Sequence, residues 1–488
     1  MGVQMKEIIP LKSINLEQIF NSNIGDYGYK KINQYKTSDV EEPSDRLEET
    51  YRTDLRRQRD KILYTGGFRR LQDKTQVISA TREGDHRTRL THTLEVEQIA
   101  ISIANALKLN VDLVSAIALG HDVGHTPFGH AAERKLCKLL EHNGQFHHPI
   151  QSIRYLWEKY GSKLDSAIYE GILLHDSDMF KIKKKDVKDQ FNYIKTVDNE
   201  SKVFEDWVKF DKWLNAFPST LESQVVIWAD KIAYITHDLE DFIRCSAYTN
   251  LKKNNKKIEG ELCNILSKLI GKTLETLDDY ESRDLIRSII TNLIESSAKT
   301  IESFDNLTQD GVKLRTEEKS KEFTQKSKNK KYLDSLLINF DNAYRGYYYE
   351  LRYFLDRYYI LSPEVQRSDA KAEVIVEWLF NKMSSNYRLL PLSLREEVDC
   401  WILKEITQNK VLKPIYDKLP KKDKTLIGFE DKIEKLSGDK KIEAEDTYKD
   451  IQTKIISRKV ACYIATMSDT YAENMYRDLI GSSVEFNL

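Results

Sequence analysis

The sequence predicts an all-α protein, and three observations lead to this fold class. Apolar residues recur at three- and four-residue spacing in most of the longer segments, which is the pattern of an amphipathic helix. Strand-like runs are scarce, the best being TQVISA at 75–80. The 488 residues include only nine prolines and nineteen glycines, which is few for an all-β design with many tight turns.

Individual helices can be placed from this periodicity. The stretch THTLEVEQIAISIANALKL at 91–109 is expected to be a helix whose apolar stripe consists of Leu94, Ile99, Ile103 and Leu107. Three later segments have the same pattern and are also expected to be helical: 222–244, 372–383 and 461–479.

The chain is expected to contain three regions. Residues 1–50 are a loosely ordered N-terminal lead-in, residues 51–250 form the core that carries the chemistry, and residues 251–488 form a C-terminal helical region that completes the substrate pocket and the subunit contacts. Four lysine-rich polar stretches are expected to be exposed loops or insertions: 181–189, 251–261, 315–331 and 419–448.

The composition limits the cellular setting and the partners. The formal net charge is −1, so no global field draws the protein to nucleic acid or anionic lipid. The five cysteines are scattered and include no CxxC pair, which favours a reducing compartment without disulfides. The chain begins without an apolar signal core, and no long apolar window is free of charged or polar interruptions. We therefore expect a cytoplasmic protein without membrane contact.

Reactive side chains are concentrated in GHDVGHTPFGH at 120–130, which holds three of the ten histidines. His121 and Asp122 follow an apolar, helix-like run and are expected at its end. Thr126 and Pro127 are a start signal for the next helix, with Thr126 as the cap and Pro127 in the first turn.

His130 and Glu133 are expected to share one face of that next helix, because they are three residues apart. A carboxylate beside an imidazole orients the ring and raises its basicity, which suits general acid–base chemistry. Two other histidines are given structural roles: His175 as a helix terminus, and His237 as part of a helix-surface pair with Asp241.

A divalent metal site requires nitrogen and oxygen donors that converge from separate elements. The His-Asp dipeptide occurs three times, at 121–122, 175–176 and 237–238, so the dipeptide alone identifies nothing. His121 and Asp122 are one candidate pair, and His92 is a natural third donor. Asp230 lies in the apolar run VVIWADKIAYI, where a buried carboxylate needs a cationic partner.

The order His92, His121-Asp122, Asp230 resembles the motif of the HD-domain metal-dependent phosphohydrolases. The flanking residues are similar to one branch of them, the deoxyguanosine triphosphate triphosphohydrolases. The resemblance extends from about residue 50 to residue 480 and rests on five ordered blocks: RRQRDKILYTGGFRRLQDKTQV (56–77), RTRLTHTLEVEQIA (87–100), ALGHDVGHTPFGHAAE (118–133), ADKIAYITHDLEDF (229–242) and YIATMSDTYA (463–472).

The resemblance implies an HD-domain helical core with site residues of three kinds. It implies a divalent ion, Mn²⁺, Mg²⁺ or Fe²⁺, held by His92, His121, Asp122 and Asp230. His130 and Glu133 match the family's catalytic pair. Seven residues match substrate contacts: Gln76 at the sugar 3′-hydroxyl, Arg89 at the α-phosphate, His125 and Lys231 at phosphates, Tyr234 and Asp238 at the deoxyribose, and His148 as a further active-site histidine. The block around His148, FHHPIQS, departs from the family pattern F-E-H-N-x-Q-S at His147 and Pro149.

The resemblance also implies the reaction and the partners. The expected activity is hydrolysis of a 2′-deoxynucleoside triphosphate, foremost dGTP, to deoxynucleoside and tripolyphosphate by attack at the α-phosphorus. Family members form hexamers or tetramers, and some respond to nucleotides or single-stranded DNA. Three alternatives stay open: a broad-specificity dNTP triphosphohydrolase, another HD-type phosphohydrolase, and a non-catalytic regulator that senses nucleotides or single-stranded DNA. No GxxxxGK[ST] loop is present, which disfavours a P-loop NTPase.

Overall fold

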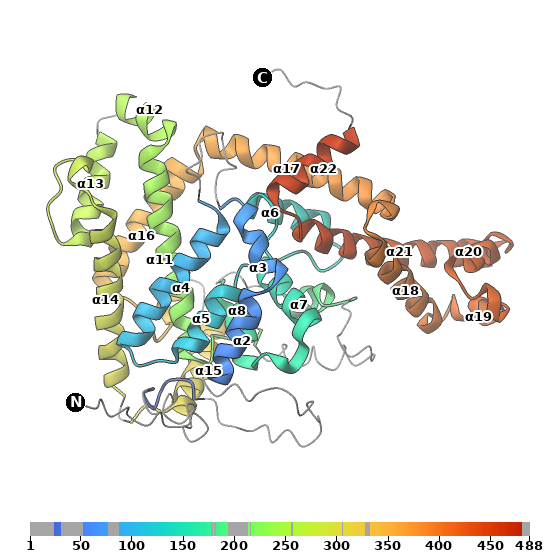
Figure 1. Cartoon of the computed structure of the whole chain (residues 1–488), viewed down its shortest axis with the longest axis horizontal. Coiled ribbons are helices and arrows are strands. Elements are labelled where there is room, and N and C mark those ends of the chain that lie inside the picture. Colours follow the sequence, from blue (N-terminus) through green and yellow to red (C-terminus); the bar gives the residue numbers. More distant parts are fainter. Residues whose placement is uncertain are drawn as a thin grey trace, which may run out of the picture.

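The protein is all-α, as the sequence predicted (Figure 1). The computed structural model describes residues 24–30, 52–76, 87–176, 179, 182–193, 213–214, 216–254, 257–304, 306–326 and 332–480. Over these residues the only β feature is one isolated bridge between Thr75 and Thr88. Most of the predicted strand at 75–80 lies outside the described residues, as do nearly all of the residues of the lead-in at 1–50.

The described segments form twenty α-helices: α2 (Asp54–Leu63), α3 (Gly66–Arg70), α4 (Arg89–Ala106), α5 (Val111–Gly120), α6 (Gly129–Leu139), α7 (His148–Tyr160), α8 (Ser166–Leu174), α9 (Lys184–Gln190), α11 (Leu221–Arg244), α12 (Ser246–Asn254), α13 (Lys257–Ile270), α14 (Ser282–Glu302), α15 (Gln309–Lys326), α16 (Asn342–Leu355), α17 (Pro363–Ser385), α18 (Leu392–Gln408), α19 (Lys413–Tyr416), α20 (Leu426–Glu434), α21 (Asp439–Ala465) and α22 (Asp469–Ile480).

The larger of two hydrophobic clusters surrounds α5, which lies against α2, α4, α8 and α11. Every residue of α5 after Val111 is buried, including Asp112 and Ser115, because these four helices cover it. Helices α13, α14 and α16 extend the same cluster from the C-terminal half of the chain. The end of α5, where His121 follows, is thereby fixed at the centre of the molecule.

One detail of the predicted apolar stripe on α4 is wrong. Ile99, Ile103 and Leu107 are buried as expected, but Leu94 is 44% exposed. The buried face of α4 is set by His92, and Leu94, two positions later, is turned about 200° away from it. In the first turn of α4 the side chain of His92 is therefore buried, whereas the hydrophobic pattern had predicted a buried Leu94.

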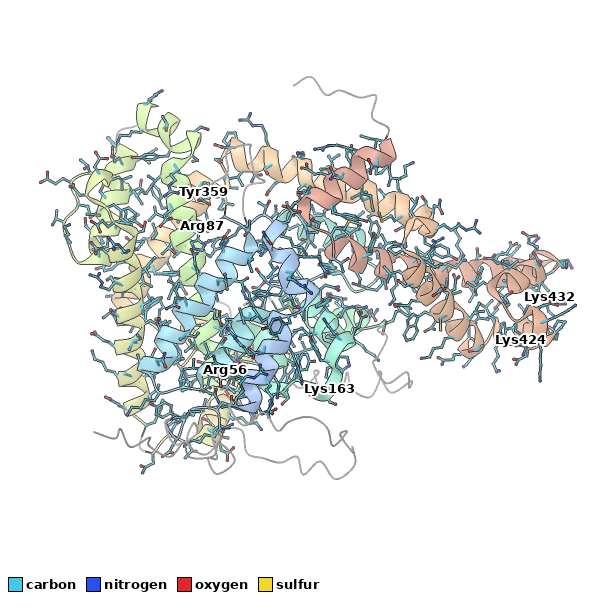
Figure 2. The ribbon with its side chains drawn as sticks, in the orientation of Figure 1. Arg56, Arg87, Lys163, Tyr359, Lys424 and Lys432 are labelled. Atoms are coloured by element: carbon cyan, nitrogen blue, oxygen red, sulfur yellow. The ribbon has the colours of Figure 1, made fainter. Side chains whose placement is uncertain are left out.

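The second hydrophobic cluster joins α6 to α17 and α21. Figure 1 shows α18, α19, α20 and α21 extending away from the first cluster as a helical arm. Lys424 and Lys432 lie near the far end of this arm (Figure 2). Because α6 also carries His130 and Glu133, the C-terminal helices pack directly on the back of a chemistry-bearing helix.

The lysine-rich stretches are largely helical rather than looped, so that prediction is wrong in part. They contribute to α9, α12, α13, α15, α20 and α21. Most of their described lysines are exposed, as predicted. Oppositely charged partners stabilise such helices along their surface, for example Lys441 and Glu445, whose charged atoms are 3.7 Å apart one turn along α21.

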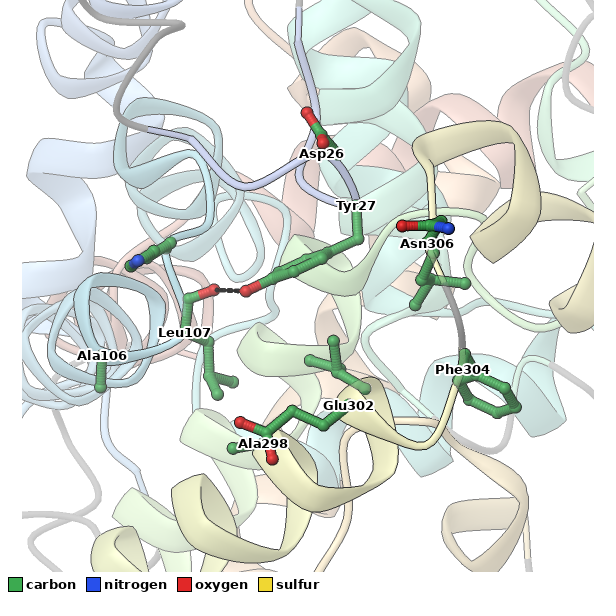
Figure 3. A pocket seen from close by; sticks show the side chains of 11 residues that line it. Asp26, Tyr27, Ala106, Leu107, Ala298, Glu302, Phe304 and Asn306 are labelled. Atoms are coloured by element: carbon green, nitrogen blue, oxygen red, sulfur yellow. Dashed lines mark hydrogen bonds between the residues drawn. The ribbon is translucent and has the colours of Figure 1, made fainter.

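Residues 24–30 form a short segment against the ends of α4 and α14. The Tyr27 hydroxyl donates a hydrogen bond of 3.0 Å to the carbonyl of Leu107. A cavity of about 410 Å³ lies beside it, with Glu302 and Phe304 among its lining residues (Figure 3). No residue of the predicted active site lines this cavity. No helix in the described part of the chain combines the length and apolar character needed to cross a bilayer.

Candidate active site

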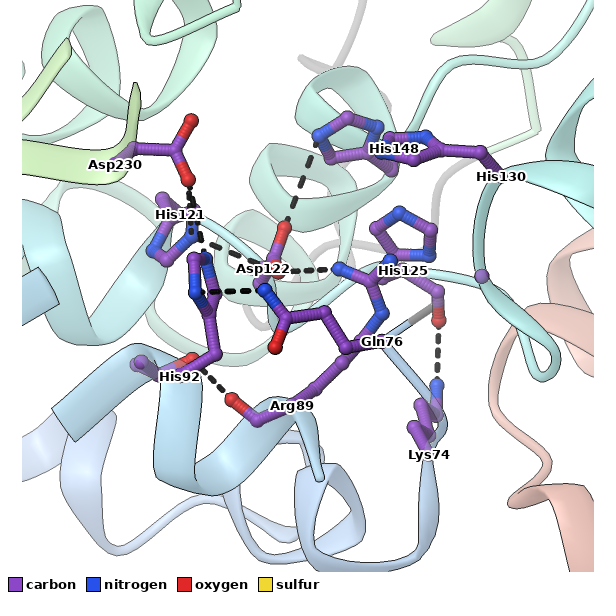
Figure 4. Close-up of polar contacts among 12 residues, drawn as sticks. Lys74, Gln76, Arg89, His92, His121, Asp122, His125, His130, His148 and Asp230 are labelled. Atoms are coloured by element: carbon purple, nitrogen blue, oxygen red, sulfur yellow. Dashed lines mark hydrogen bonds and ion pairs between the residues drawn. The ribbon is translucent and has the colours of Figure 1, made fainter. Parts of the chain in front are cut away.

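The predicted site residues come together from several elements around the end of α5 (Figure 4). Helix α4 supplies Arg89 and His92, and the residues after α5 supply His121 and Asp122. Helix α11 supplies Asp230, which lies beside His121 (Figure 4). These side chains are separated by up to 141 positions in the sequence, and the packing of α4 against α5 and α11 brings them together.

His92, His121 and Asp230 form a cluster of potential metal donors. One ligand atom from each lies within 4.8 Å of the others. The Nε2 atom of His92 is 3.1 Å from an Asp230 carboxylate oxygen, and the Nε2 atom of His121 is 3.9 Å from the same oxygen. Asp122 lies beside them, with Oδ2 3.5 Å from His121 Nε2.

The hydrogen bonds around this cluster leave its inner atoms available to a cation. His121 Nδ1 is 2.6 Å from the carbonyl oxygen of Ala118 and therefore carries the proton. The buried Nε2 of His121 has no hydrogen-bond partner. Gln76 Nε2 lies 2.9 Å from His92 Nδ1. The two ends of an amide are interchangeable by a flip, and with the oxygen toward the ring the proton sits on Nδ1, which leaves His92 Nε2 free to bind a cation. Two imidazole nitrogens and two carboxylates fit a divalent cation.

The carboxylates of this cluster are held in the charged form. Burial would raise the pKa of Asp122, but His121 and Arg89 hold it well below its usual range. Arg89 makes the closer contact, 2.5 Å from Asp122 Oδ2, with both side chains almost fully buried. Burial also acts to raise the pKa of Asp230, and Lys231 and His92 hold it well below normal.

A second cluster of potential donors lies next to the first and consists of His125, His130, Glu133 and His148. As predicted, His130 and Glu133 share one face of α6: His130 Nδ1 is 3.1 Å from Glu133 Oε2. The other Glu133 oxygen accepts hydrogen bonds from the backbone N–H of His148, at 2.7 Å, and from its ring Nδ1, at 2.9 Å. His125 stacks on His148 with the ring centroids 4.5 Å apart.

The residues of this second cluster differ in exposure and in charge. Burial acts to raise the pKa of Glu133, but His148 and His130 hold it well below its usual range. Burial acts to lower the pKa of His148, yet Glu133 raises it to about 9. Glu133 and His148 thus form a buried ion pair. The His130 side chain is 47% exposed, so it is the accessible end of the group.

The predicted start of α6 is wrong by two residues. The helix begins at Gly129, and the residue before it, Phe128, has a left-handed backbone with φ 58°. The Thr126 hydroxyl donates a hydrogen bond of 2.9 Å to the carbonyl of Gly129 instead of capping the helix. The tertiary structure, described below, holds this turn in place of a local cap.

His175 lies in the site, which the sequence argument missed. It does end α8, as predicted, but its Nε2 is 3.2 Å from Nε2 of His148 and its ring centroid is 5.0 Å from that of His121. Its Nδ1 faces the carbonyl of Ile172 at 2.7 Å, and burial lowers its pKa. The usable signal was that His175-Asp176 follows an apolar helix in the same way as His121-Asp122.

The other histidines lie outside the two clusters. The predicted helix-surface pair of His237 with Asp241 is wrong: His237 is buried, forms an ion pair with Glu95, and has its ring centroid 5.5 Å from that of His92. Helix α4 packs against α11 and therefore supplies the partner. His147 Nδ1 contacts Gln190 at 2.9 Å, His142 is exposed, and His86 lies outside the described residues.

The remaining predicted substrate contacts follow one face of α11. Lys231 Nζ is 3.4 Å from Asp230 Oδ2. Further along α11, Tyr234 and Asp238 share a partner that sequence reasoning missed, Arg352 of α16. Its guanidinium lies 4.6 Å from the centroid of the Tyr234 ring and 3.3 Å from Asp238 Oδ2.

Asp238 and Arg352 are unequally buried. Asp238 is fully buried, and burial raises its pKa well above the usual range despite Arg352. The Arg352 side chain is one-third exposed. Arg352 stands in the aromatic run YYYELRY at 347–353, which matches no motif, so only the packing of α16 on α11 identifies it.

Comparison with known proteins places this arrangement among metal-dependent hydrolases. The HD domain family matches residues 89–235. A deoxyguanosinetriphosphate triphosphohydrolase-like protein of Caldanaerobacter subterraneus subsp. tengcongensis is 41% identical over 257 residues, 51% of this chain and 62% of the relative, which is less than two thirds of that relative's length. The like-named protein of Rickettsia bellii is 33% identical over 362 residues, 72% of this chain and 84% of the relative. That of Bartonella quintana is 32% identical over 351 residues, 70% and 81% of the two chains.

Proposed function

The chain belongs to the deoxyguanosinetriphosphate triphosphohydrolase-like family, and from this premise we propose that it hydrolyses a 2′-deoxynucleoside triphosphate, foremost dGTP, to deoxynucleoside and tripolyphosphate. One observation carries the proposal: the metal-donor cluster and the His130–Glu133–His148 group lie side by side, with Asp122 Oδ1 3.7 Å from His148 Nε2. Metal-assisted hydrolysis of a phosphate ester uses both kinds of group at one phosphorus atom.

His92, His121, Asp122 and Asp230 are the residues that would hold the cation. When bound there, Mn²⁺, Mg²⁺ or Fe²⁺ would polarise a phosphoryl oxygen and offset the charge that develops on it. The donor set suits all three ions, since it combines imidazole nitrogen with carboxylate oxygen.

The phosphate chain needs further positive charge, which this chain's own residues supply. Arg89 is fixed by Asp122 and approaches the metal donors from α4. Lys231 lies on α11, beside Asp230. His148, held in its charged form by Glu133, adds a third cation, and His125 stacks upon it. Preorganised cations of this kind stabilise the charge of a phosphoryl-transfer transition state.

His130 and Glu133 are proposed to position and activate the attacking water. Glu133 accepts a hydrogen bond from His130 Nδ1, which leaves the exposed ring's Nε2 free to exchange a proton. In the proposed reaction the water oxygen bonds to the α-phosphorus, and the bond from this phosphorus to the sugar O5′ breaks. The water gives up a proton and the O5′ leaving group gains one, so an imidazole that accepts and then donates a proton serves both.

Selection of deoxyribose is assigned to Tyr234, with Asp238 and Gln76 as hydrogen-bonding partners of the sugar. A tyrosine ring packed against C2′ excludes a 2′-hydroxyl sterically. We expect Tyr234→Ala to raise the GTP to dGTP ratio of kcat/KM by roughly tenfold or more, the scale of discrimination that a packed pocket achieves. Tyr347→Ala, a half-buried tyrosine of α16 outside the proposed contacts, is the control and should leave the ratio unchanged. An unaltered ratio in Tyr234→Ala would remove Tyr234 from sugar selection.

Assembly, effectors and location belong to the same proposal. The family resemblance supports a hexamer or tetramer and a nucleotide or single-stranded DNA effector, and the cysteine pattern favours a cytoplasmic location. Broad specificity across the four dNTPs is the nearest alternative, because no residue described here is assigned to the base. Light scattering of the purified protein, with and without dNTP, tests the assembly.

The reaction itself is tested by identifying the products. The protein is incubated with each dNTP and with GTP in Mn²⁺ or Mg²⁺, and the released phosphate is separated by ion chromatography. Tripolyphosphate with deoxynucleoside is the expected result, and the rates across the four bases decide specificity. Release of orthophosphate or pyrophosphate would refute attack at the α-phosphorus. No release at all would redirect the search to cyclic nucleotides and to binding of single-stranded DNA.

A further inference from the structure

Asp469, the first residue of α22, contacts two segments of the active site although it is more than 300 positions away from both. It belongs to the C-terminal block YIATMSDTYA, to which the proposed function gives no role. Its side chain is 8% exposed. Its Oδ1 accepts a hydrogen bond of 2.8 Å from the backbone N–H of Phe128, and its Oδ2 accepts one of 2.9 Å from the backbone N–H of Thr75 and another from the Thr75 hydroxyl.

The first of these contacts holds an unfavourable turn. Phe128 and Gly129 are consecutive residues with positive φ, 58° and 63°. A left-handed backbone is unfavourable for a residue that carries a side chain, so the surrounding structure must hold Phe128 in it. This turn joins His125 to His130 and sets where the His130 ring lies. A Cβ atom at Gly129 would lie 3.0 Å from the carbonyl oxygen of Gln76, so the turn packs directly against the other segment.

The second contact holds the segment that leads to Gln76. Lys74, on the same segment, is 1% exposed and donates hydrogen bonds to the carbonyl oxygens of His125 and of Ala465, the latter at 2.8 Å. The Lys74 carbonyl in turn accepts a 2.8 Å hydrogen bond from the backbone N–H of Arg89. Residues 465–469 therefore form hydrogen bonds with the 74–76 segment and with the 125–130 turn, and both of these carry predicted site residues. Figure 4 shows the hydrogen bond between Lys74 and His125 that links the two segments.

Capping of its own helix does not explain Asp469. Ser468 caps α22 instead. Its hydroxyl accepts a hydrogen bond of 3.3 Å from the N–H of Tyr471, and its carbonyl accepts one of 3.0 Å from the N–H of Ala472. Both Asp469 oxygens bond to other segments instead. A buried carboxylate whose two oxygens accept three hydrogen bonds from two distant segments fixes their separation, since loss of either segment leaves the charge unsatisfied.

We propose that Asp469 is a positioning residue of the active site, which locks the 125–130 turn against the 74–76 segment and thereby aligns His130 with the substrate. The effect on catalysis rests on the proposed function, whereas the locking of the two segments by Asp469 does not. Asp469 touches no metal donor, so it sets the geometry of the acid–base group without contributing to metal binding.

Two substitutions and a matched control test the proposal. Asp469→Asn keeps the shape but has one acceptor oxygen, so it satisfies one segment and turns an N–H₂ group toward the donors of the other. Asp469→Ala removes both contacts. Asp478→Ala, exposed on the same helix, is the control. We expect kcat to fall roughly tenfold or more in both Asp469 variants, with KM changed less than about threefold, because small misplacement of a reacting group costs rate rather than binding. Bound metal per chain should be unchanged.

Hydrogen exchange gives a readout that does not depend on activity. Peptides covering 123–131 and 72–76 should exchange faster in both Asp469 variants than in wild type or Asp478→Ala, while peptides of α5 stay protected. If wild type hydrolyses no dNTP, the proposed function fails, and the exchange rates alone decide whether Asp469 locks the turn.

Two results would overturn the inference: unchanged exchange at 123–131, or unchanged kcat in an otherwise active enzyme. If Asp469→Ala loosens the whole chain, Thr75→Val replaces it, since this change removes only the hydroxyl contact to Asp469. It should then accelerate exchange at 72–76 and lower kcat by a smaller factor than Asp469→Asn, and no change in either quantity would likewise refute the lock.

Discussion

Asp230→Ala is expected to remove the bound metal and the hydrolytic activity together. Asp230 Oδ1 lies within 4 Å of Nε2 of both His92 and His121, so its loss takes the shared carboxylate from the centre of the donor cluster. Even partners outside the ligand set change metal affinity by roughly 10–100-fold, so loss of a ligand should weaken binding by at least about a hundredfold. Metal per chain is measured by elemental analysis after gel filtration, and turnover by release of tripolyphosphate from dGTP.

The Asp230 experiment needs a graded variant and a control for folding. Asp230→Asn retains one oxygen but no charge, and it should show an intermediate metal affinity. Asp478→Ala should match wild type in metal content and turnover, since its side chain is exposed. An Asp230→Ala protein that retains full metal content would show that the ion is held by other residues, such as those around Glu133.

Glu133→Gln is expected to lower turnover while metal and nucleotide remain bound. Glu133 orients the exposed His130 ring through Nδ1 and keeps His148 charged. A neutral amide has one acceptor oxygen for the two imidazoles and no charge to hold His148 protonated. A positioned acid–base group contributes about 10²–10⁴ to the rate, so kcat should fall by at least about a hundredfold with little change in KM. Single-turnover hydrolysis with excess protein, together with nucleotide binding by calorimetry, separates the two quantities.

The matched control for Glu133 is Glu141→Gln, which changes an exposed carboxylate just beyond the end of the same helix. It should behave as wild type in every measurement. Turnover of Glu133→Gln within about twofold of wild type would exclude Glu133 from the mechanism. If Glu133→Gln lost its metal and Asp230→Ala retained it, the cluster around Glu133 would be the metal site and the cluster around Asp230 would not.

The two variants are most informative together, because they separate two causes of inactivity. Asp230→Ala should be inactive and depleted of metal, whereas Glu133→Gln should be inactive with its metal retained. The two groups are linked by short contacts: Glu133 lies 2.9 Å from His148, which lies 3.7 Å from Asp122 of the metal-donor cluster. A general distortion of the site would therefore make the two variants behave alike. Different metal contents at similar losses of rate would support two distinct functions within one site.

The fold class and the cores of the main helices could be read from the sequence because they depend on local periodicity. Helix α5 is predominantly apolar, and its end at Gly120 was placed correctly from this apolar run. The contact of His130 with Glu133 also follows from spacing on one helix. The lysine-rich stretches were misassigned as loops because their polarity was read without the paired charges that support a helix, such as Lys441 with Glu445.

Residues whose position depends on packing between helices could not be read in this way. His175 and His237 are buried because α8 and α11 carry them inward, and Leu94 is exposed because His92 takes the buried face of α4. Arg352 reaches Tyr234 only because α16 crosses α11. The pattern within one segment does not predict these contacts, because they depend on which faces of separate helices pack together.

The sequence by itself determined the helical class, the family, and the ordered set of histidines and carboxylates, because these are properties of residue type and spacing along one chain. Only the tertiary structure decided which of these groups face one another, and it added His175, Arg352 and Asp469 to the site or its support. The turn at Phe128 shows why. Its left-handed backbone is unfavourable locally and depends on a hydrogen bond to Asp469, 341 positions away.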